Sequence, residues 1–559
     1  MTKRLGIVLL ATVGLASLAH AADLPTTKAP AAAPKPNCWE SVWTWLNTSA
    51  DDCPIGAYGI TLYGTLDVGV GYQEWGAFRN PSADKLNYGV QKSGHEHYLQ
   101  PTYNALSSNV LGLKMKEDLA PLGLANWSLV GVLEAGINPY SGILTNPIRS
   151  LADNNLNAAN GSVVINGKTF FNHWQTGNYD SSRNGSWDNS QGYAGISNKT
   201  WGTLTFGRTN TLSYDTMNKY DPIASTAFSQ IGFSGSFPGW GNTELNRFNT
   251  AFTYKVAIPD VYAFSTVRLA GQAQVGGYGM QNGSMGSYFG QAGFDWGNFS
   301  FDAVVGWAKD AVSLSSFGGS PQPPCNGDIY AIKVNNTCQD PNSILKATLS
   351  NNFGTDLMAS YKWDQFKFYG GYIYARDSNP SDSFLTGFKT IYPAVSVPAG
   401  YFVKGVLTND AVTSNPFNHS RVQQTIWTGV RYSVPDYWLH GYGSLDLAAA
   451  FYYQWQNNYN FSVDKLGNTI GAACTGTGAF ISSSKCGGAI DAFSFFADWK
   501  PVKRVDIYAG VMIQTVYGGL ANGFFNTAAY FNPVTKTFIT TQHAFTTNYD
   551  PTIGIRVRF

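Results

Sequence analysis

Charged side chains are scarce in this 559-residue chain: Asp, Glu, Lys and Arg together make up 13% of it, against about 25% in ordinary soluble domains. Such a deficit indicates that much of the surface lies against something other than water. Long hydrophobic runs are also missing after residue 21, where no stretch approaches the ~20 apolar residues of a membrane-spanning helix. The mean hydropathy of −0.15 likewise argues against a helical membrane protein.

Catalytic and metal-binding motifs are missing as well. No two histidines have the i, i+4 spacing of a helical zinc motif, and neither a Gly-x-Ser-x-Gly elbow nor a P-loop occurs. The pair His95 and His97 could share one strand face, but it stands in a polar stretch that favours a solvated loop. The formal net charge is +1, which gives no indication of nucleic-acid binding. The sequence predicts no enzyme activity, no cofactor and no metal.

The N-terminus has the layout of a cleavable export signal. Lys3 and Arg4 precede an apolar run from Leu5 to Ala19, and the small-residue site Ala19-His20-Ala21 follows. We expect cleavage after Ala21. A membrane anchor is disfavoured because the run is short.

Six cysteines form three local pairs, an arrangement that favours disulfides in an exported protein. Six cysteines allow fifteen pairings, and the sequence alone does not select one. A zinc site is disfavoured because no Cys-x-x-Cys occurs. The pairs are Cys38 with Cys53, Cys325 with Cys338, and Cys474 with Cys486.

Strict alternation of apolar and polar residues is the main pattern of the chain from Ile60 onward. Because successive side chains of a strand point to opposite faces, one face can meet lipid and the other water. Sixteen segments have this pattern. They lie near 60–72, 109–117, 124–137, 190–198, 202–208, 246–256, 262–275, 287–296, 299–310, 355–363, 366–376, 421–433, 442–456, 490–500, 503–517 and 548–559.

The connections between these segments alternate in length. Short ones include 297–298 and 364–365, whereas 138–189 and 377–420 are long. Short turns on one side, long loops on the other and an even number of strands are typical of outer-membrane barrels. The sequence therefore predicts an all-β fold, a 16-stranded antiparallel transmembrane β-barrel.

The ionised residues test this prediction, because a charge on the lipid face is costly at mid-depth. Three ionised residues, Lys309, Arg376 and Asp491, fall on the apolar face of their strands. They stand at strand ends, where the energetic cost of a charge facing lipid falls. A soluble β-sandwich would also alternate, but it requires no even number of long strands. The residues on the polar face are Asp67, Lys114, Lys116, Glu134, Arg268, Asp302, Lys362, Lys367, Arg431, Asp446, Asp498, Arg504, Asp506, Arg556 and Arg558.

Several motifs resemble the general diffusion porins of Gram-negative outer membranes. They are Ile60-Thr-Leu-Tyr-Gly-Thr-Leu-Asp67, Leu111-Gly-Leu-Lys-Met-Lys-Glu-Asp-Leu119, Gly192-Tyr-Ala-Gly-Ile-Ser and Trp201-Gly-Thr-Leu-Thr-Phe-Gly-Arg208. The last strand ends on Phe559, similar to the assembly signal of outer-membrane proteins. The resemblance covers most of the chain from Ile60 to Phe559.

This resemblance implies a homotrimer of water-filled passive diffusion channels for ions and small hydrophilic solutes. It places the protein in the outer membrane, in contact with lipid and lipopolysaccharide, and implies recognition of Phe559 by the barrel assembly machinery. We therefore expect a signal peptide over 1–21, a periplasmic extension over 22–58 and the barrel over 59–559. The extension comprises an Ala/Pro-rich tether and the Cys38–Cys53 segment.

The resemblance also implies that the third loop, residues 209–245, folds inward and narrows the pore. Its acids Asp215, Asp221 and Glu244 would face the wall bases Lys114, Arg208 and Arg247. The family often has an arginine at the position of Val110, and Lys116 is the expected replacement. By alternation, Arg208 lies on the same strand face as the apolar residues Leu204 and Phe206. Its side chain therefore reaches the lumen only if the strand ends or bulges at Gly207.

Two expectations about solutes follow. The nine wall bases exceed the six wall acids, which indicates a slight anion preference. The alternative to a general sieve is a substrate-selective channel for sugars or aromatic acids. This alternative arises because the alternation of the strands turns five aromatic side chains toward the lumen. They are Tyr63, Tyr369, Trp427, Tyr452 and Tyr508.

Overall fold

A computed structural model describes residues 38–73, 98–140, 190–233, 247–275, 286–312, 348–378, 420–458, 487–518 and 551–559, with short pieces at 142, 144, 162–165, 168–171, 187, 332–334, 337–339, 525–532, 537–544 and 547–549. The expected signal peptide and tether, the His95–His97 pair, Glu244, Cys325, Cys474 and Cys486 lie outside the described residues. So does the side chain of Cys338.

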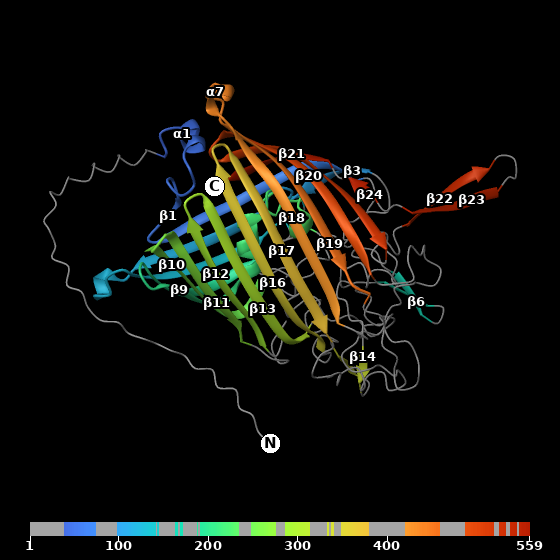
Figure 1. Cartoon of the computed structure of the whole chain (residues 1–559), viewed down its shortest axis with the longest axis horizontal. Coiled ribbons are helices and arrows are strands. Elements are labelled where there is room, and N and C mark those ends of the chain that lie inside the picture. Colours follow the sequence, from blue (N-terminus) through green and yellow to red (C-terminus); the bar gives the residue numbers. More distant parts are fainter. Residues whose placement is uncertain are drawn as a thin grey trace, which may run out of the picture.

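Sixteen strands form a closed antiparallel barrel, as the alternation predicted (Figure 1). Two of them come in two pieces, the second as β3 and β4 and the last as β24 and β25. The strands are β2 Ile60–Gln73, β3 Tyr98–Tyr103 with β4 Val110–Asp118, β5 Trp127–Gly136, β8 Gln191–Asn198, β9 Gly202–Asn210, β10 Arg247–Val261, β11 Phe264–Gln274, β12 Gly286–Trp296, β13 Phe299–Val312, β16 Thr348–Trp363, β17 Phe366–Ser378, β18 Arg421–Val434, β19 Ser444–Gln456, β20 Gly488–Val502, β21 Val505–Gly518, and β24 Thr547–Tyr549 with β25 Thr552–Arg558.

The barrel closes between its first and last strands. β2 pairs antiparallel with β25 from Thr65 opposite Arg558 to Gly71 opposite Thr552. The backbone of Phe559 continues this seam, because its N–H donates to Gly64 O at 3.1 Å and its carbonyl accepts from Gly64 N at 3.0 Å. Closure gives the first and last strands of the barrel a neighbour on both sides.

The remaining elements are short. Three hairpins stand apart from the barrel sheet: β6 Ser162–Ile165 with β7 Lys168–Phe171, β14 Ile332–Val334 with β15 Thr337–Gln339, and β22 Phe525–Asn532 with β23 Thr537–Ala544. The helices are α1 Val42–Asn47, η1 Ala120–Leu122, α3 Leu212–Tyr220, α4 Gln230–Phe233 and α7 Asp436–Leu439. In the part of the chain that the structure describes, no helix is long and apolar enough to cross a membrane.

Residues 38–57, the described part of the N-terminal extension, lie at the end of the barrel that carries the short turns, where α1, α7 and the C-terminus lie (Figure 1). Cys38 and Cys53 form the expected disulfide. Ser41 caps α1 by accepting from Thr44 N at 3.0 Å, and β1 Ile55–Ala57 pairs with the start of β2.

Arg504 holds this extension to the turn between β20 and β21. Its guanidinium donates to the carbonyls of Trp45, Thr48, Ser49 and Cys53 at 2.8 to 3.2 Å and lies 4.2 Å from the centre of the Trp45 ring. The residue is 1% exposed. The expectation that Arg504 adds a base to the open lumen wall is therefore wrong, since the extension covers its charge.

Candidate functional site

An inner loop, residues 211–233, follows β9 and packs against the inside of the barrel. Its first part is α3, which begins at the N-cap Thr211 and carries Asp215 in its first turn and Lys219 in its last turn, the favourable order for the helix dipole. Leu212 and Met217 are fully buried in a cluster that includes Met358 and Ile373 of the wall. This apolar contact stabilises the position of the loop on the wall.

Polar bonds fix α3 at both ends. The hydroxyl of Ser213 donates to the Asp356 carboxylate, and that of Tyr220 donates to Asp302 Oδ2 at 2.6 Å. Asp302 also forms a salt bridge with Arg268, whose Nη2 lies 2.9 Å from Asp302 Oδ2. Both carboxylates are buried on the wall, where an unbonded charge would be costly, so these bonds define one position for the helix.

The second part of the loop continues along β18 to β21. The indole of Trp427 donates to Tyr220 O at 3.0 Å, and the hydroxyl of Ser494 donates to Phe228 O at 2.5 Å. Gln514 donates to the side chain of Gln230. The loop is therefore bonded to the wall over most of its length.

A second inward turn, residues 104–109 between β3 and β4, contacts the second part of the inner loop. Asp67 accepts from the backbone N–H groups of Leu106 at 2.6 Å and Ser107 at 2.7 Å, and Ala227 N donates to Ala105 O at 2.8 Å. The sequence pattern did not predict this turn. The available signal was the polar stretch Ser107-Ser108-Asn109 directly before the second expected strand.

Three of the expected constriction residues lie together. Lys114, Lys116 and Asp215 line a cavity of about 460 Å³. Asp215 Oδ2 lies 2.6 Å from Lys255 Nζ, which lines the same cavity. The sequence did not single out Lys255, although it follows the alternation of β10.

Arg208 and Arg247 are placed differently. Both are almost fully buried, and both bind Ser190. Arg208 Nε donates to Ser190 O at 3.1 Å, and Arg247 Nη2 donates to Ser190 Oγ at 3.0 Å. Ser190 in turn donates to Glu134. The expected irregularity is present: Gly207 has φ of 138°, and the β9–β10 register shifts between Phe248 and Ala251.

Asp221 is enclosed rather than open to the lumen. It is 1% exposed and accepts from Tyr452 OH at 2.6 Å, Ser225 N at 2.7 Å and Ile223 N at 3.2 Å. Burial raises the pKa of its carboxyl, against the opposing effect of these bonds. The geometry makes Asp221 an anchor of the loop.

The lumen aromatics are likewise engaged. Tyr63 donates to Glu134 at 2.8 Å and Tyr508 to Asp67 at 2.5 Å, while Tyr452 and Trp427 hold the inner loop. The other four lumen aromatics, Tyr369, Trp427, Tyr452 and Tyr508, are at most 7% exposed. They therefore offer no open track on which a solute could stack.

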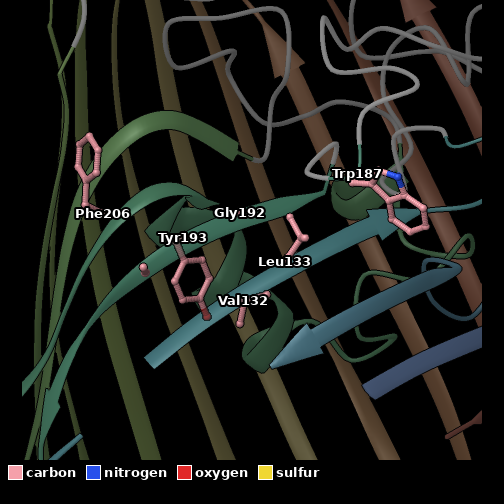
Figure 2. A pocket seen from close by; sticks show the side chains of 7 residues that line it. Val132, Leu133, Trp187, Gly192, Tyr193 and Phe206 are labelled. Atoms are coloured by element: carbon pink, nitrogen blue, oxygen red, sulfur yellow. The ribbon is translucent and has the colours of Figure 1, made fainter. Parts of the chain in front are cut away.

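The wall beside the Lys114 cavity is formed in part by β5 and β8. Figure 2 shows Tyr193 and Val132 pointing to one side of this wall and Leu133 and Phe206 to the other. The small residues Gly192 and Ala194 leave a hollow of about 450 Å³ there. Tyr193 also lines the cavity of Lys114, so it belongs to the lumen side.

Within the described ranges, no group of three or more His, Cys, Asp and Glu side chains lies close enough to hold a metal ion.

Comparison with known proteins gives a family match over most of the chain. The profile described as Gram-negative porin matches residues 7–512. No curated protein matches the sequence. Among solved structures, an anion-selective porin from Comamonas acidovorans has 12% identity and a TM-score of 0.45, covering 89% of this chain and 99% of its own. An outer-membrane protein OmpT of Vibrio cholerae has 13% identity and a TM-score of 0.43, covering 91% and 100%.

Proposed function

The chain belongs to the Gram-negative porin family, a family of outer-membrane passive diffusion channels, and from this premise we propose how its lumen filters solutes. The inner loop and the turn at 104–109 narrow the lumen, and charged groups at the edge of the loop select by size and charge. The observation that carries the proposal is the cavity in which Lys114, Lys116 and Lys255 face Asp215.

The filter works through fixed charges in a narrow space. Water screens charges less where it is confined between protein walls, so a passing ion interacts with these groups more strongly than in bulk solution. Arg208 and Arg247 support the filter by fixing the ends of β9 and β10 through Ser190. Asp221 supports it by holding the loop.

The expected partners follow from the family. We propose a homotrimer in contact with lipid and lipopolysaccharide, delivered by a cleaved signal peptide and inserted through recognition of Phe559. We also propose that solutes pass unchanged and that the protein catalyses no reaction. The selective channel for sugars or aromatic acids is disfavoured by the engaged lumen aromatics.

Planar-bilayer recording of the purified full-length protein tests the proposal. We expect stepwise ohmic conductance, uptake of neutral sugars into liposomes that falls smoothly with sugar size, and a weakly anion-selective reversal potential in a KCl gradient. The outcome against a diffusion channel is negligible conductance. A clearly cation-selective pore would refute the anion preference alone.

A further inference from the structure

Three basic residues lie side by side on neighbouring strands near the short-turn end of the barrel. Lys362 of β16 is directly opposite Lys367 of β17, and Lys367 is directly opposite Arg431 of β18. We call these three residues the basic row. Like charges directly opposite each other in a sheet are destabilising, so the arrangement has a stability cost that the fold does not require.

The basic row has no carboxylate bonded to it within the described part of the chain. Lys367 Nζ lies 4.8 Å from the centre of the Tyr369 ring, a weak cation–π contact. Arg431 donates from Nη2 to Pro222 O at 2.9 Å, and its buried Nε has no hydrogen-bond partner. The row therefore retains donors for a ligand.

The acids near the basic row are already paired with other bases. Arg431, Lys219 and Lys362 repel Lys367, while Asp295 attracts it. Asp295 is already shared between Arg268 and Lys219. Asp446, on the other side, lies 3.0 Å from Lys500 and also attracts Arg431.

Arg431 is the member of the basic row that lines a neighbouring cavity. Arg431 lines a space of about 360 Å³ between the inner loop and the wall, together with Ser225, Asp498 and Arg558. Lys500 and Arg556 also line this space, and Asp498 is the one acid in its lining. The lining is therefore polar and favours a polar occupant.

We propose that the basic row and this cavity form a binding site for a small oxyanion, which the channel retains briefly during passage. Arg431 supplies the planar fork that suits carboxylate and phosphate groups, and the two lysines supply point charges. The inference rests on the proposed channel function and specifies one solute class that it favours. Its location, on β16 to β18, is separate from the cavity of Lys114.

Block of the chloride current by inorganic phosphate tests the site. In bilayers containing the full-length protein, we expect phosphate to reduce the current in a saturable way, whereas glucose at the same concentration does not. In the double variant Lys362→Gln/Lys367→Gln, the half-blocking phosphate concentration should rise roughly tenfold, because two nearby positive charges are removed. Arg431 is left intact because it also holds the inner loop through Pro222.

The matched control removes the same charge from exposed turns at the same end, as Lys199→Gln/Lys503→Gln. It should retain the wild-type half-blocking concentration. The site is overturned if the Lys362→Gln/Lys367→Gln variant keeps the wild-type half-blocking phosphate concentration, or if this concentration rises equally in the control. Either result leaves the channel function standing. A wild-type protein without conductance overturns both.

Discussion

The hydroxyl of Tyr452, on β19, donates a 2.6 Å hydrogen bond to Oδ1 of Asp221 in the inner loop, across a sequence separation of 231 residues. Both groups are buried. A buried carboxylate needs its donors, and Tyr452 supplies one from the barrel wall. This bond therefore couples the loop to the barrel.

Tyr452→Phe should loosen the inner loop. Loss of the hydroxyl leaves Asp221 short of a donor at a cost of about 1–3 kcal/mol, and we expect a lower unfolding temperature and noisier open-channel current. The neighbouring Tyr453→Phe, which removes a hydroxyl from the opposite face of the same strand, is the control. Equal current noise in both variants would show that the bond does not restrain the loop.

Gly371 and Gly370 form a matched pair for testing the packing of Trp427. A Cβ on Gly371 would lie 2.1 Å from the Trp427 ring, whereas one on Gly370 would lie 3.7 Å from its nearest neighbour, Trp427 O. Gly371→Ala should displace the indole from Tyr220 O and destabilise the barrel by about 1–3 kcal/mol, as overpacking does. Gly370→Ala should be neutral. Thermal unfolding of the two variants in detergent measures the difference, and equal melting temperatures would contradict it.

Asp215→Asn should make the channel more selective for anions. The change removes the acid paired with Lys255 at 2.6 Å, so the lumen gains one unit of net positive charge. Because the pair is partly exposed, its loss should cost at most about 1 kcal/mol of stability. Reversal potentials in a KCl gradient measure the effect. Asp260→Asn, at the exposed end of β10, is the control, and an equal shift there would mean that position in the lumen is irrelevant.

Arg504→Met should release the N-terminal extension. The substitution removes the donor to four backbone carbonyls, so we expect faster reduction of the Cys38–Cys53 disulfide and earlier proteolytic cleavage near α1. The adjacent exposed Lys503→Met should behave as wild type. Unchanged reduction and cleavage in Arg504→Met would show that the disulfide and β1 hold the extension without it.

The barrel followed from the sequence because alternation is a local property. A strand such as Ile60–Gln73 shows its two faces in consecutive residues, and one misplaced charge would reveal a wrong register. The sixteen expected segments correspond to the sixteen strands, with boundaries shifted by a few residues in most cases. The largest error was the second strand, where the piece Tyr98–Tyr103 was missed because the turn at 104–109 separates it from the rest.

The lumen was less predictable because its contacts join residues far apart in the chain. The sequence determined which side chains face inward, among them Tyr452, Lys367 and Arg431, since parity along each strand decides that. Only the tertiary structure decided that Asp221 is held by Tyr452, that Arg504 is covered by the N-terminal extension, and that Lys362, Lys367 and Arg431 stand in one row. These depend on strand register and on the path of the inner loop, which are set by packing between distant segments rather than by any local pattern.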